Sequence, residues 1–511
     1  MKNIKKYTIR PVFQSILEYI IQRASSKQKF SYSTLKTEGC GRNEESMGKY
    51  TQASVSFETA DASLARLYGE AERKCRGNLK DFGGRRVLIE GGGYNKIWLE
   101  TQPMGGEMYA FRDIEAAMNN TLLFMDHQRG DGRLPGSIAY EDGRLIPQFN
   151  KIQGFCLPWH ALNLYYITGR DRAYLQSLYD CLAAFDAYLW RTRDSDGDGC
   201  LESWCVTDTG EDGALRYADA PFWWTEERPP EGYAVVPIAS MDFMGYSCAA
   251  RDTLAEASRL LGDGREEYWR GKAEAVRERV KAYLWDEGRG ACFDRDKHGS
   301  VMPALLHNNL RLMYYGGMSR GMADRFIREH LLNPDEFWTR VPLPSVAIND
   351  PTFRNIPGNN WSGQPQGLTY QRAILALERY GYAELLPRLA ERFYAAIGPE
   401  CVFTQQFDPF ASNAEGTHTS GCTDGYGPTM LAALGYVEHT RGIHVCHDAL
   451  YWSAFGAGEY EYTLQWDGKT YTLESDGRMA RGYVNGKHIF TCKAGGRVAT
   501  DSVGTSLRSS Q

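Results

Sequence analysis

Residues 165–175, YYITGRDRAYL, contain the end of one helix, a glycine that stops it and the start of the next helix. Gly169 suits a helix C-terminus because glycine adopts the left-handed backbone found there at little steric cost. The next segment, 171–190, carries an apolar stripe of Leu175, Leu178, Leu182, Phe185 and Leu189. Spacings of three and four place these side chains on one helix face, so the stretch predicts a helical hairpin.

The same arrangement recurs at Gly262 in RLLGDGREEYW, at Gly316 in YYGGMSRGMADRF and at Gly381 in ERYGYAELLPRL. The intervals between these glycines are too long and too irregular for a solenoid repeat. Further stripes predict helices over 61–79, 112–128, 156–168, 237–261, 266–285, 303–315, 320–332, 365–380, 383–397 and 426–440. About eleven helices, paired as hairpins and separated by long segments, predict a closed double ring of helices whose loops form a central pocket.

Beyond about residue 442 the apolar period changes to two, which is typical of strands. Asp467-Gly468, Asp476-Gly477 and Asn485-Gly486 mark three hairpin turns. We therefore expect a helical domain over 61–441 and a small antiparallel β domain over 442–511. The β domain is interpreted as a cap on apolar helix surface in preference to a sugar-binding module. Residues 1–60 are polar and weakly periodic, and are expected to form a weakly structured leader.

The composition is that of a folded, water-soluble chain. Of 511 residues, 42% are hydrophobic and 24% charged, and the formal net charge of -6 leaves no excess of cations for a nucleic-acid partner. No apolar run approaches the roughly 20 residues that cross a bilayer. The N-terminus has no signal-peptide pattern, and the twelve cysteines include no C-x-x-C pair. We therefore expect a cytoplasmic protein, with no membrane or nucleic-acid partner; its oligomeric state stays open.

Several motifs carry weak signals for other chemistry. DSDGDG at 194–199 has the alternating acids of a calcium loop, but the twelfth position is Cys205 where a glutamate is needed, so a tight polar turn is favoured over a bound cation. His444 and His447 form H-x-x-H without a nearby third ligand, which favours packing between domains. P-loop, nucleophile-elbow and dinucleotide-binding motifs are absent from the sequence. No cofactor and no catalytic metal are expected.

Carboxylates, amides and aromatic residues crowd the segments between the predicted helices. These segments are 98–113, 150–159, 202–217, 358–367 and 404–429. Each precedes or begins a predicted helix, which would bring them to a common rim. Cleavage of a glycosidic bond needs one carboxyl group that protonates the leaving oxygen and a second that acts on the opposite face of the sugar. The alternative, that these acids cap helices and form surface ion pairs, is favoured for any single residue but not for the whole set.

Five of these segments resemble known motifs in order and spacing. PMGGEMYAFRD, KIQGFCLP, ESWCVTDTGEDGALRY, NNWSGQP and DGYGPTMLAAL are similar to the signature segments of inverting α-glycosidases of families 37 and 63, which include trehalases, processing α-glucosidases and mannosylglycerate hydrolases. The resemblance covers residues 60 to 440. It implies an all-α (α/α)6 barrel, to which the small C-terminal antiparallel β domain is added, and an inverting, metal-free hydrolysis by two carboxyl groups.

The resemblance also implies individual roles. Asp212 matches the general acid, with Asp208 as a competitor for that role. The subsite for the cleaved sugar would be lined by Asp113, Arg112, Gln153, Asp208, Arg216, Asn360, Trp361, Gln364 and Gln405. Arg112 and Ser362 depart from the tryptophan and arginine of the family pattern, which points to a substrate other than trehalose.

The largest departure from the family pattern is at the position of the general base. The family glutamate falls on Gln405, and an amide has no lone pair basic enough to accept a proton from water at neutral pH. Glu415, Asp408 and Asp424 are the candidate replacements, with Glu415 preferred. The sequence therefore predicts an exo-acting α-glycosidase that hydrolyses a small oligosaccharide or glycoside with inversion. A sugar-binding descendant without catalysis, a phosphorylase and an epimerase on the same scaffold stay open as alternatives.

Overall fold

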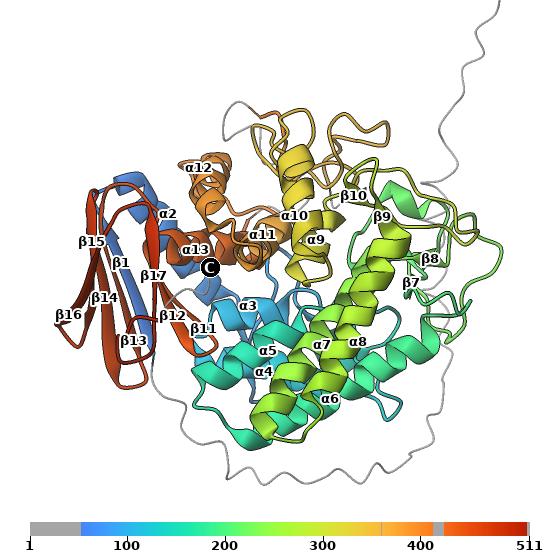
Figure 1. Ribbon diagram of the computed structural model, residues 1–511, viewed down its shortest axis with the longest axis horizontal. Helices are drawn as coiled ribbons and strands as arrows, with labels where there is room; N and C mark the ends of the chain where they lie inside the picture. Colours follow the sequence, from blue (N-terminus) through green and yellow to red (C-terminus); the bar gives the residue numbers. More distant parts are fainter. Residues whose placement is uncertain (1–52, 359, 412–423, 508–511) are drawn as a thin grey trace, which may run out of the picture. The chain divides into compact units, whose positions relative to one another are not determined.

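The protein is described by a computed structural model, in which residues 53–358, 360–411 and 424–507 are placed (Figure 1). Helices dominate between residues 62 and 441 and strands dominate after residue 442, as predicted. The helices are α2 (Ala62–Gly77), α3 (Gln102–Met108), α4 (Ile114–Asp126), α5 (Leu157–Ile167), α6 (Arg172–Thr192), α7 (Met241–Leu261), α8 (Glu266–Arg279), α9 (Asn308–Tyr314), α10 (Arg320–Phe326), α11 (Gly367–Arg379), α12 (Leu386–Ile397) and α13 (Gly427–Arg441). Every helix predicted from an apolar stripe is present, and α3 is additional.

The four predicted hairpins are confirmed by the backbone. Gly169, Gly262, Gly316 and Gly381 have φ of 94°, 69°, 75° and 75°, the left-handed region that a glycine favours. They follow α5, α7, α9 and α11, and in each case the next helix begins within a few residues. The chain therefore turns sharply at the C-terminal ends of these four helices, whereas long segments lead into their N-terminal ends.

Alternate helices contact one another in a closed order. Helix α3 contacts α5, α5 contacts α7, α7 contacts α9, α9 contacts α11, α11 contacts α13, and α13 contacts α3. We call these six the ring helices. Helices α2, α4, α6, α8 and α12 pack against one or two of them (Figure 1). The contact pattern thus closes on itself and has a second set of helices packed against the first.

Sequence explains which helices enter the ring. In α5 every residue except Trp159 is buried, because the helix is apolar on all sides and neighbours surround it. In α12 the buried residues are spaced by three and four along one face. A helix with a single apolar stripe buries that stripe and leaves its other side to solvent.

The described strands form one five-stranded sheet, two three-stranded sheets and three two-stranded ribbons. The strands are β1 (Ser54–Thr59), β2 (Leu79–Asp81), β3 (Arg86–Leu88), β4 (Ile97–Trp98), β5 (Ser137–Glu141), β6 (Arg144–Gln148), β7 (Glu202–Ser203), β8 (Ile238–Ala239), β9 (Trp285–Asp286), β10 (Ala291–Cys292), β11 (Ile443–Cys446), β12 (Ala449–Ala454), β13 (Glu459–Trp466), β14 (Lys469–Asp476), β15 (Met479–Val484), β16 (Lys487–Lys493) and β17 (Gly496–Thr500). The five-stranded sheet has the order β1-β13-β14-β15-β16, and the three-stranded sheets have the orders β11-β12-β17 and β4-β5-β6.

The C-terminal sheet is antiparallel, and its three predicted turns are present. One strand was not predicted: β1, from the end of the segment expected to be a leader, pairs with β13 over its full length. The rest of that segment lies outside the described residues. Side chains of β13 reach the helices, since the indole of Trp466 donates to the carbonyl of Ile167 at 2.9 Å and its ring meets Phe111 edge-on. Among the described helices, none combines the length and the apolar character needed to span a membrane.

Candidate active site

The segments that lead into the ring helices are joined by backbone hydrogen bonds. These run from Gly427 N to Glu90 O (2.6 Å), from Cys156 N to Leu99 O (3.1 Å), from Gly154 N to Asp208 O (2.8 Å), from Trp361 N to Asp212 O (3.1 Å) and from Gly367 N to Gln405 O (2.8 Å). We call the joined segments the rim; it comprises residues 88–101, 150–156, 202–217, 360–367, 401–411 and 424–427. Stretches hundreds of residues apart thus meet at the N-terminal ends of the ring helices.

A buried carboxyl group, Glu90, lies on the rim directly after strand β3. Its exposed fraction is 7%, and the Tyr426 hydroxyl donates to its Oε1 at 3.1 Å. Burial, with the nearby charge of Glu100, raises the pKa of Glu90 to about 8. Glu90 is therefore protonated at neutral pH and becomes a carboxylate only at mildly alkaline pH.

Gln405, the residue at the family's base position, lies beside the same aromatic pair. The Tyr94 hydroxyl donates to Gln405 Oε1 at 2.9 Å, and the Tyr94 ring meets the ring of Tyr426 edge-on at 6.2 Å between centroids. The tyrosine pair thus holds Gln405 through one hydroxyl and Glu90 through the other. A carboxyl group therefore lies on the side of the rim where the family glutamate is expected.

A second carboxylate, Glu100, is fixed just before α3. Arg372 Nη2 donates to its Oε1 at 3.1 Å, and Gln153 Nε2 donates to its Oε2 at 3.3 Å. Space around Glu100 is tight, because a Cβ atom on Gly210 would lie 1.8 Å from Oε2. The other amide atom of Gln153, Oε1, is buried and has no hydrogen-bond partner within the described part of the chain. That oxygen is available to a bound hydroxyl group.

Asp212 is half-buried on another stretch of the rim, where the Trp361 amide donates to its backbone carbonyl. Its charge acts on Glu90, whose pKa it helps to raise, and on Lys151. Lys151 lies with its ammonium group 4.8 Å from the centroid of the Trp98 ring, and burial lowers its pKa. The indole nitrogen of Trp361 is buried without a hydrogen-bond partner among the described residues. Asp212, Glu90 and Lys151 therefore belong to one electrostatic environment.

Beneath this part of the rim lies a buried network of ion pairs. Glu211 is paired with Arg216, with Arg311 Nη1 at 3.3 Å and with His307 Nε2 at 3.0 Å. Burial opposes the charge on Glu211, but the two arginines outweigh it and hold the pKa of Glu211 well below its usual range. Arg216 is also paired with Asp242 at 3.2 Å. Arg216 thus supports the loop that carries Asp212, and it also lines a small pocket with Trp361, where its Nε has no hydrogen-bond partner in the described chain.

Asp208 is likewise a buried support. Its carboxylate pairs with Arg193 Nη1 at 2.6 Å and accepts from the amides of Trp204 (2.8 Å) and Ile152 (3.0 Å). Burial opposes ionisation, yet the charge and hydrogen bonds of Arg193 keep the pKa of Asp208 below its ordinary value. A carboxylate held ionised in this way cannot donate a proton, and it ties two stretches of the rim together.

Two predicted subsite residues lie away from the rim. Asp113 caps α4 by accepting from Ala116 N at 2.9 Å and pairs with Arg86 Nε at 2.8 Å. Arg112 is buried against α2, where it pairs with Glu72 and donates to the Tyr68 hydroxyl at 3.1 Å. The structure therefore does not bring Asp113 and Arg112 to the other predicted site residues.

Of the remaining predicted residues, some lie on the rim and others are held in local turns or ion pairs. Asn360 Oδ1 accepts from Ser362 N at 2.9 Å, and the backbone N–H of Asn360 donates to Gln406 Oε1 at 3.3 Å, so Asn360 belongs to the rim. Gln364 is joined to the same Gln406 side chain. Asp408 accepts from Phe410 N at 2.8 Å in a turn. Asp424 pairs with Lys74 Nζ at 2.6 Å. Glu415 lies outside the described residues.

Sequence reasoning missed Glu90 and Glu100. Glu90 ends the buried run VLIE and is followed by three glycines, so it is a carboxyl group at the end of a strand, where a polar side chain is unusual unless it has a role. Glu100 directly precedes α3, the ring helix that the sequence did not predict. The sequence would indicate Glu90 and Glu100 as site residues only if strand β3 and helix α3 were already known.

The acidic loop 194–199 forms a tight polar turn. Carboxylate oxygens of Asp194, Asp196 and Asp198 lie within 4.8 Å of one another, but each accepts a backbone amide of the loop itself. Asp198 also pairs with Arg279 at 3.3 Å.

Three solved structures are similar to this fold. Mannosylglycerate hydrolase of family 63 from Thermus thermophilus, in complex with glucose, aligns with a TM-score of 0.58 and 19% identity over 73% of this chain and 99% of its own. Neutral trehalase Nth1 from Saccharomyces cerevisiae aligns with a TM-score of 0.52 and 13% identity over 70% of this chain and 74% of its own. The α-L-rhamnosidase from Dictyoglumus thermophilum aligns with a TM-score of 0.57 and 11% identity over 88% and 50% of the two chains.

The sequence itself matches one family. None of the curated proteins matches the chain. The family model described as the mannosylglycerate hydrolase MGH1-like glycoside hydrolase domain matches residues 107–423, which include Asp212 and Gln405. Because that match spans more than half of the chain, the protein belongs to the mannosylglycerate hydrolase MGH1-like glycoside hydrolases.

Proposed function

We propose that the protein is an exo-acting α-glycosidase that hydrolyses a small glycoside with inversion of configuration. The ring helices, with the helices packed against them, would form an (α/α)6 barrel whose rim is the active site. The observation that carries the proposal is the pair Asp212 and Glu90, two carboxyl groups on different stretches of one rim, where the charge of Asp212 helps to raise the pKa of Glu90. Inverting hydrolysis needs such a pair on opposite faces of the sugar ring.

In this proposal Asp212 is the general acid and Glu90 the general base. Glu90, once ionised, takes a proton from a water molecule as the water oxygen bonds to the anomeric carbon. The glycosidic bond breaks at the same centre, and Asp212 gives its proton to the leaving oxygen. The products are the inverted sugar and the free alcohol, and one proton has moved from Asp212 to the leaving group. We expect the two carboxyl groups to stand about 6.5–9.5 Å apart, which leaves room for the water.

Glu100 and Gln153 would bind hydroxyl groups of the sugar, and the Trp361 indole nitrogen would donate to another. Support comes from Gln153 Oε1 and Trp361 Nε1, which are buried polar atoms without partners in the described chain. Such atoms are costly unless a ligand or water completes them. Glu100 takes the place that the sequence assigned to Asp113, since it precedes a ring helix.

We infer a small glycoside of mannose or glucose as the substrate, and mannosylglycerate is the first compound to test. Lys151 supports an acidic aglycone, because its ammonium group is buried beside Asp212 and a carboxylate of the substrate would compensate that charge. A cytoplasmic location fits the ten described cysteines, all of which are free thiols.

Proton NMR of the reaction tests the proposal. The protein is incubated with mannosylglycerate, trehalose and aryl α-glucosides and α-mannosides, and we expect a β-anomer to appear first, with mutarotation later. Appearance of the α-anomer first would contradict inversion. Turnover that requires inorganic phosphate would identify a phosphorylase, and product without bond cleavage an epimerase.

Gln405 favours a second candidate, a sugar-binding protein that has lost hydrolysis with the family glutamate. That function predicts ligand-induced thermal stabilisation without any product, in wild type and in the Glu90→Gln variant alike. Product formation by the wild type rejects it.

A further inference from the structure

A cavity of about 390 Å³ lies at the other end of the ring helices. Its lining includes the last residues of α3, α9 and α11, represented by Glu107, Tyr314 and Glu378, together with strand β11. The rim, in contrast, precedes the N-terminal ends of the ring helices. The cavity is therefore distinct from the proposed active site.

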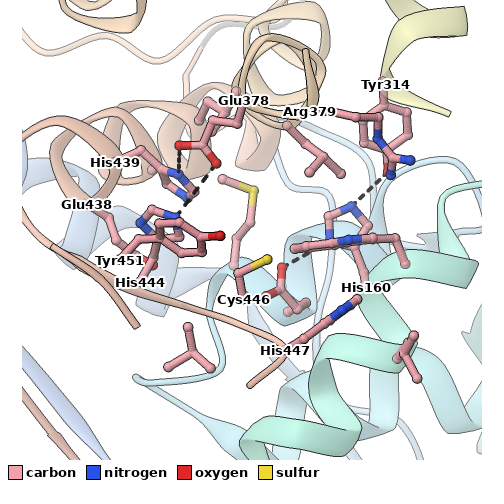
Figure 2. Close-up of a pocket in the computed structure, with 18 of the residues that line it drawn as sticks. His160, Tyr314, Glu378, Arg379, Glu438, His439, His444, Cys446, His447 and Tyr451 are labelled. Atoms are coloured by element: carbon pink, nitrogen blue, oxygen red, sulfur yellow. Dashed lines mark hydrogen bonds and ion pairs between the residues drawn. The ribbon is translucent and has the colours of Figure 1, made fainter. Parts of the chain in front are cut away.

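Three side chains from three elements meet in this cavity: Glu378 near the end of α11, His439 near the end of α13, and His444 in β11 (Figure 2). One carboxylate oxygen and one ring nitrogen from each histidine lie within 4.8 Å of one another. His439 Nδ1 is 2.8 Å from Glu378 Oε1, and His444 Nε2 is 3.7 Å from Glu378 Oε2. These two separations involve different oxygens of Glu378. Ligand atoms around a tetrahedral ion with bonds of about 2.0–2.1 Å are roughly 3.3 Å apart, a spacing that small side-chain shifts would give to one carboxylate oxygen and the two ring nitrogens.

His444 is the part of this cluster that the protein leaves unsatisfied. The residue is 4% exposed, and its Nδ1 is buried without a hydrogen-bond partner in the described chain. Its Nε2 faces Glu378 at 3.7 Å, beyond hydrogen-bond length. The ring is held in place by stacking, with centroids 3.9 Å from His439 and 5.2 Å from Tyr451. Buried polar groups in folded proteins are normally paired, so an unpaired imidazole aimed at a carboxylate points to a missing ligand.

Charge around the cavity favours a cation. Five carboxyl groups line it, from Glu107, Asp252, Glu256, Glu378 and Glu438, whereas its arginines are only Arg379 and Arg497. Arg497 is already paired with Glu378 and donates to the His439 carbonyl at 3.2 Å. Arg497 itself lines the cavity and donates to Oε1, the oxygen that also faces His439, so it orients the carboxylate and leaves Oε2 for an ion. Asp252 and Glu256 are already paired with Arg277 and Arg259. Burial raises the pKa of Glu438 to about 7, so the negative charge for a cation comes mainly from Glu378 and Glu107.

We propose that Glu378, His439 and His444 bind one divalent transition-metal ion, with Zn²⁺ the best match to two imidazoles and a carboxylate. The fourth position faces the cavity and takes water. The ion joins α11, α13 and β11, so its role is to fasten the β11-β12-β17 sheet to the ring helices. His444 belongs to the H-x-x-H pattern, but its partners come from elsewhere in the chain; His447 stacks on Trp159 and Tyr166 and is not a ligand.

Metal binding by the full-length protein tests the proposal. Protein stripped with a chelator is titrated with Co²⁺, and the visible absorption of the bound ion and the binding heat are recorded. We expect one ion per chain, tetrahedral absorption bands, and a rise in melting temperature with Zn²⁺. His444→Asn should weaken binding at least about 100-fold, more than the loss of a supporting residue typically costs. The matched control His447→Asn, three residues away in the same cavity, should bind as the wild type does.

Asp196→Asn is a second control, because it alters the other acidic cluster and leaves the cavity intact. Wild-type protein that binds no Co²⁺ stoichiometrically, or binding that survives His444→Asn and is lost in Asp196→Asn, overturns the proposal. Should His444→Asn fail to fold, crystals of the wild type soaked in Zn²⁺ decide the matter without any variant. An anomalous peak between Glu378, His439 and His444 supports the site, and its absence there contradicts it.

Discussion

Replacement of Glu90 by glutamine tests both the unusual acidity of this residue and its role. Its pKa lies near 8 in the folded protein against an ordinary value of 4.5, so between these values the folded state holds a proton that the unfolded state has lost. The free energy of unfolding must therefore fall as pH rises through this window, by about 1.4 kcal/mol per pH unit. From pH 5 to pH 7 the wild type therefore loses about 3 kcal/mol of unfolding free energy through Glu90. The Glu90→Gln variant does not lose it, because glutamine does not titrate.

We expect Glu90→Gln to melt at a temperature close to that of the wild type at pH 5 and several degrees above it at pH 8. Calorimetry of both proteins across this range measures the difference, in which the titration of all other groups cancels. A melting-temperature difference that is independent of pH would refute the raised pKa. With a good substrate, the same variant should lose about 10²–10⁴-fold in kcat, the usual contribution of a general base. Near-normal turnover would refute the assignment of Glu90 as base.

The remaining predictions concern activity against pH, the general acid, a close contact and a buried support. Wild-type kcat/KM should fall about tenfold per pH unit above about pH 8, because the reaction needs one proton on the pair Asp212 and Glu90 and that proton is lost as Glu90 ionises; a profile that stays level through pH 9 would argue against it. Asp212→Asn should lower kcat about 10²–10⁴-fold while thermal-shift titration still detects sugar binding. Gly210→Ala should reduce sugar affinity, since its Cβ would collide with Glu100 and its φ is 76°, whereas Gly264→Ala, away from the rim with the same φ and open space around its Cβ, serves as the control for a left-handed glycine. Arg193→Met should cost about 3–5 kcal/mol in urea unfolding near neutral pH, because Asp208 is left buried and unpaired; the cost should shrink as pH falls and Asp208 takes up a proton.

The helices were predictable because their signals are local. A stripe such as Leu175, Leu178 and Leu182 fixes both the helix and its buried face, and Gly169 ends the preceding helix by its backbone freedom alone. Strand β1 was not predictable in the same way. Its partner β13 lies about 400 residues away, and six polar and apolar residues in alternation carry little information until that partner is known.

Asp113 and Arg112, which lie away from the rim, were predicted beside the sugar for one physical reason. Helix α3 contains Pro103, Gly105 and Gly106, so propensity gives no helix there, and the sequence motif placed its acid on Asp113. With α3 in the ring, the acid at the rim is Glu100, whereas Asp113 precedes the outer helix α4. The chain reverses direction between α3 and α4, so the N-terminal ends of these two helices lie at opposite ends of the helix pair.

Arg216 and Asp208 illustrate a different difficulty. Motif matching finds charged residues near the site, but whether they face a ligand or one another depends on pairing partners such as Asp242 and Arg193, which no local pattern reveals. The cluster of Glu378, His439 and His444 could not be predicted for the same reason. Glu378 lies 61 residues before His439, so no local sequence pattern links the carboxylate to the histidines.

The central claim is that two carboxyl groups from distant stretches of the rim act on a single sugar. A crystal structure with a bound monosaccharide or iminosugar measures this directly. We expect the carboxyl groups of Asp212 and Glu90 on opposite faces of the anomeric carbon, about 6.5–9.5 Å apart, with a water beside Glu90. A sugar bound elsewhere, or both groups on the same face of the ring, would contradict it.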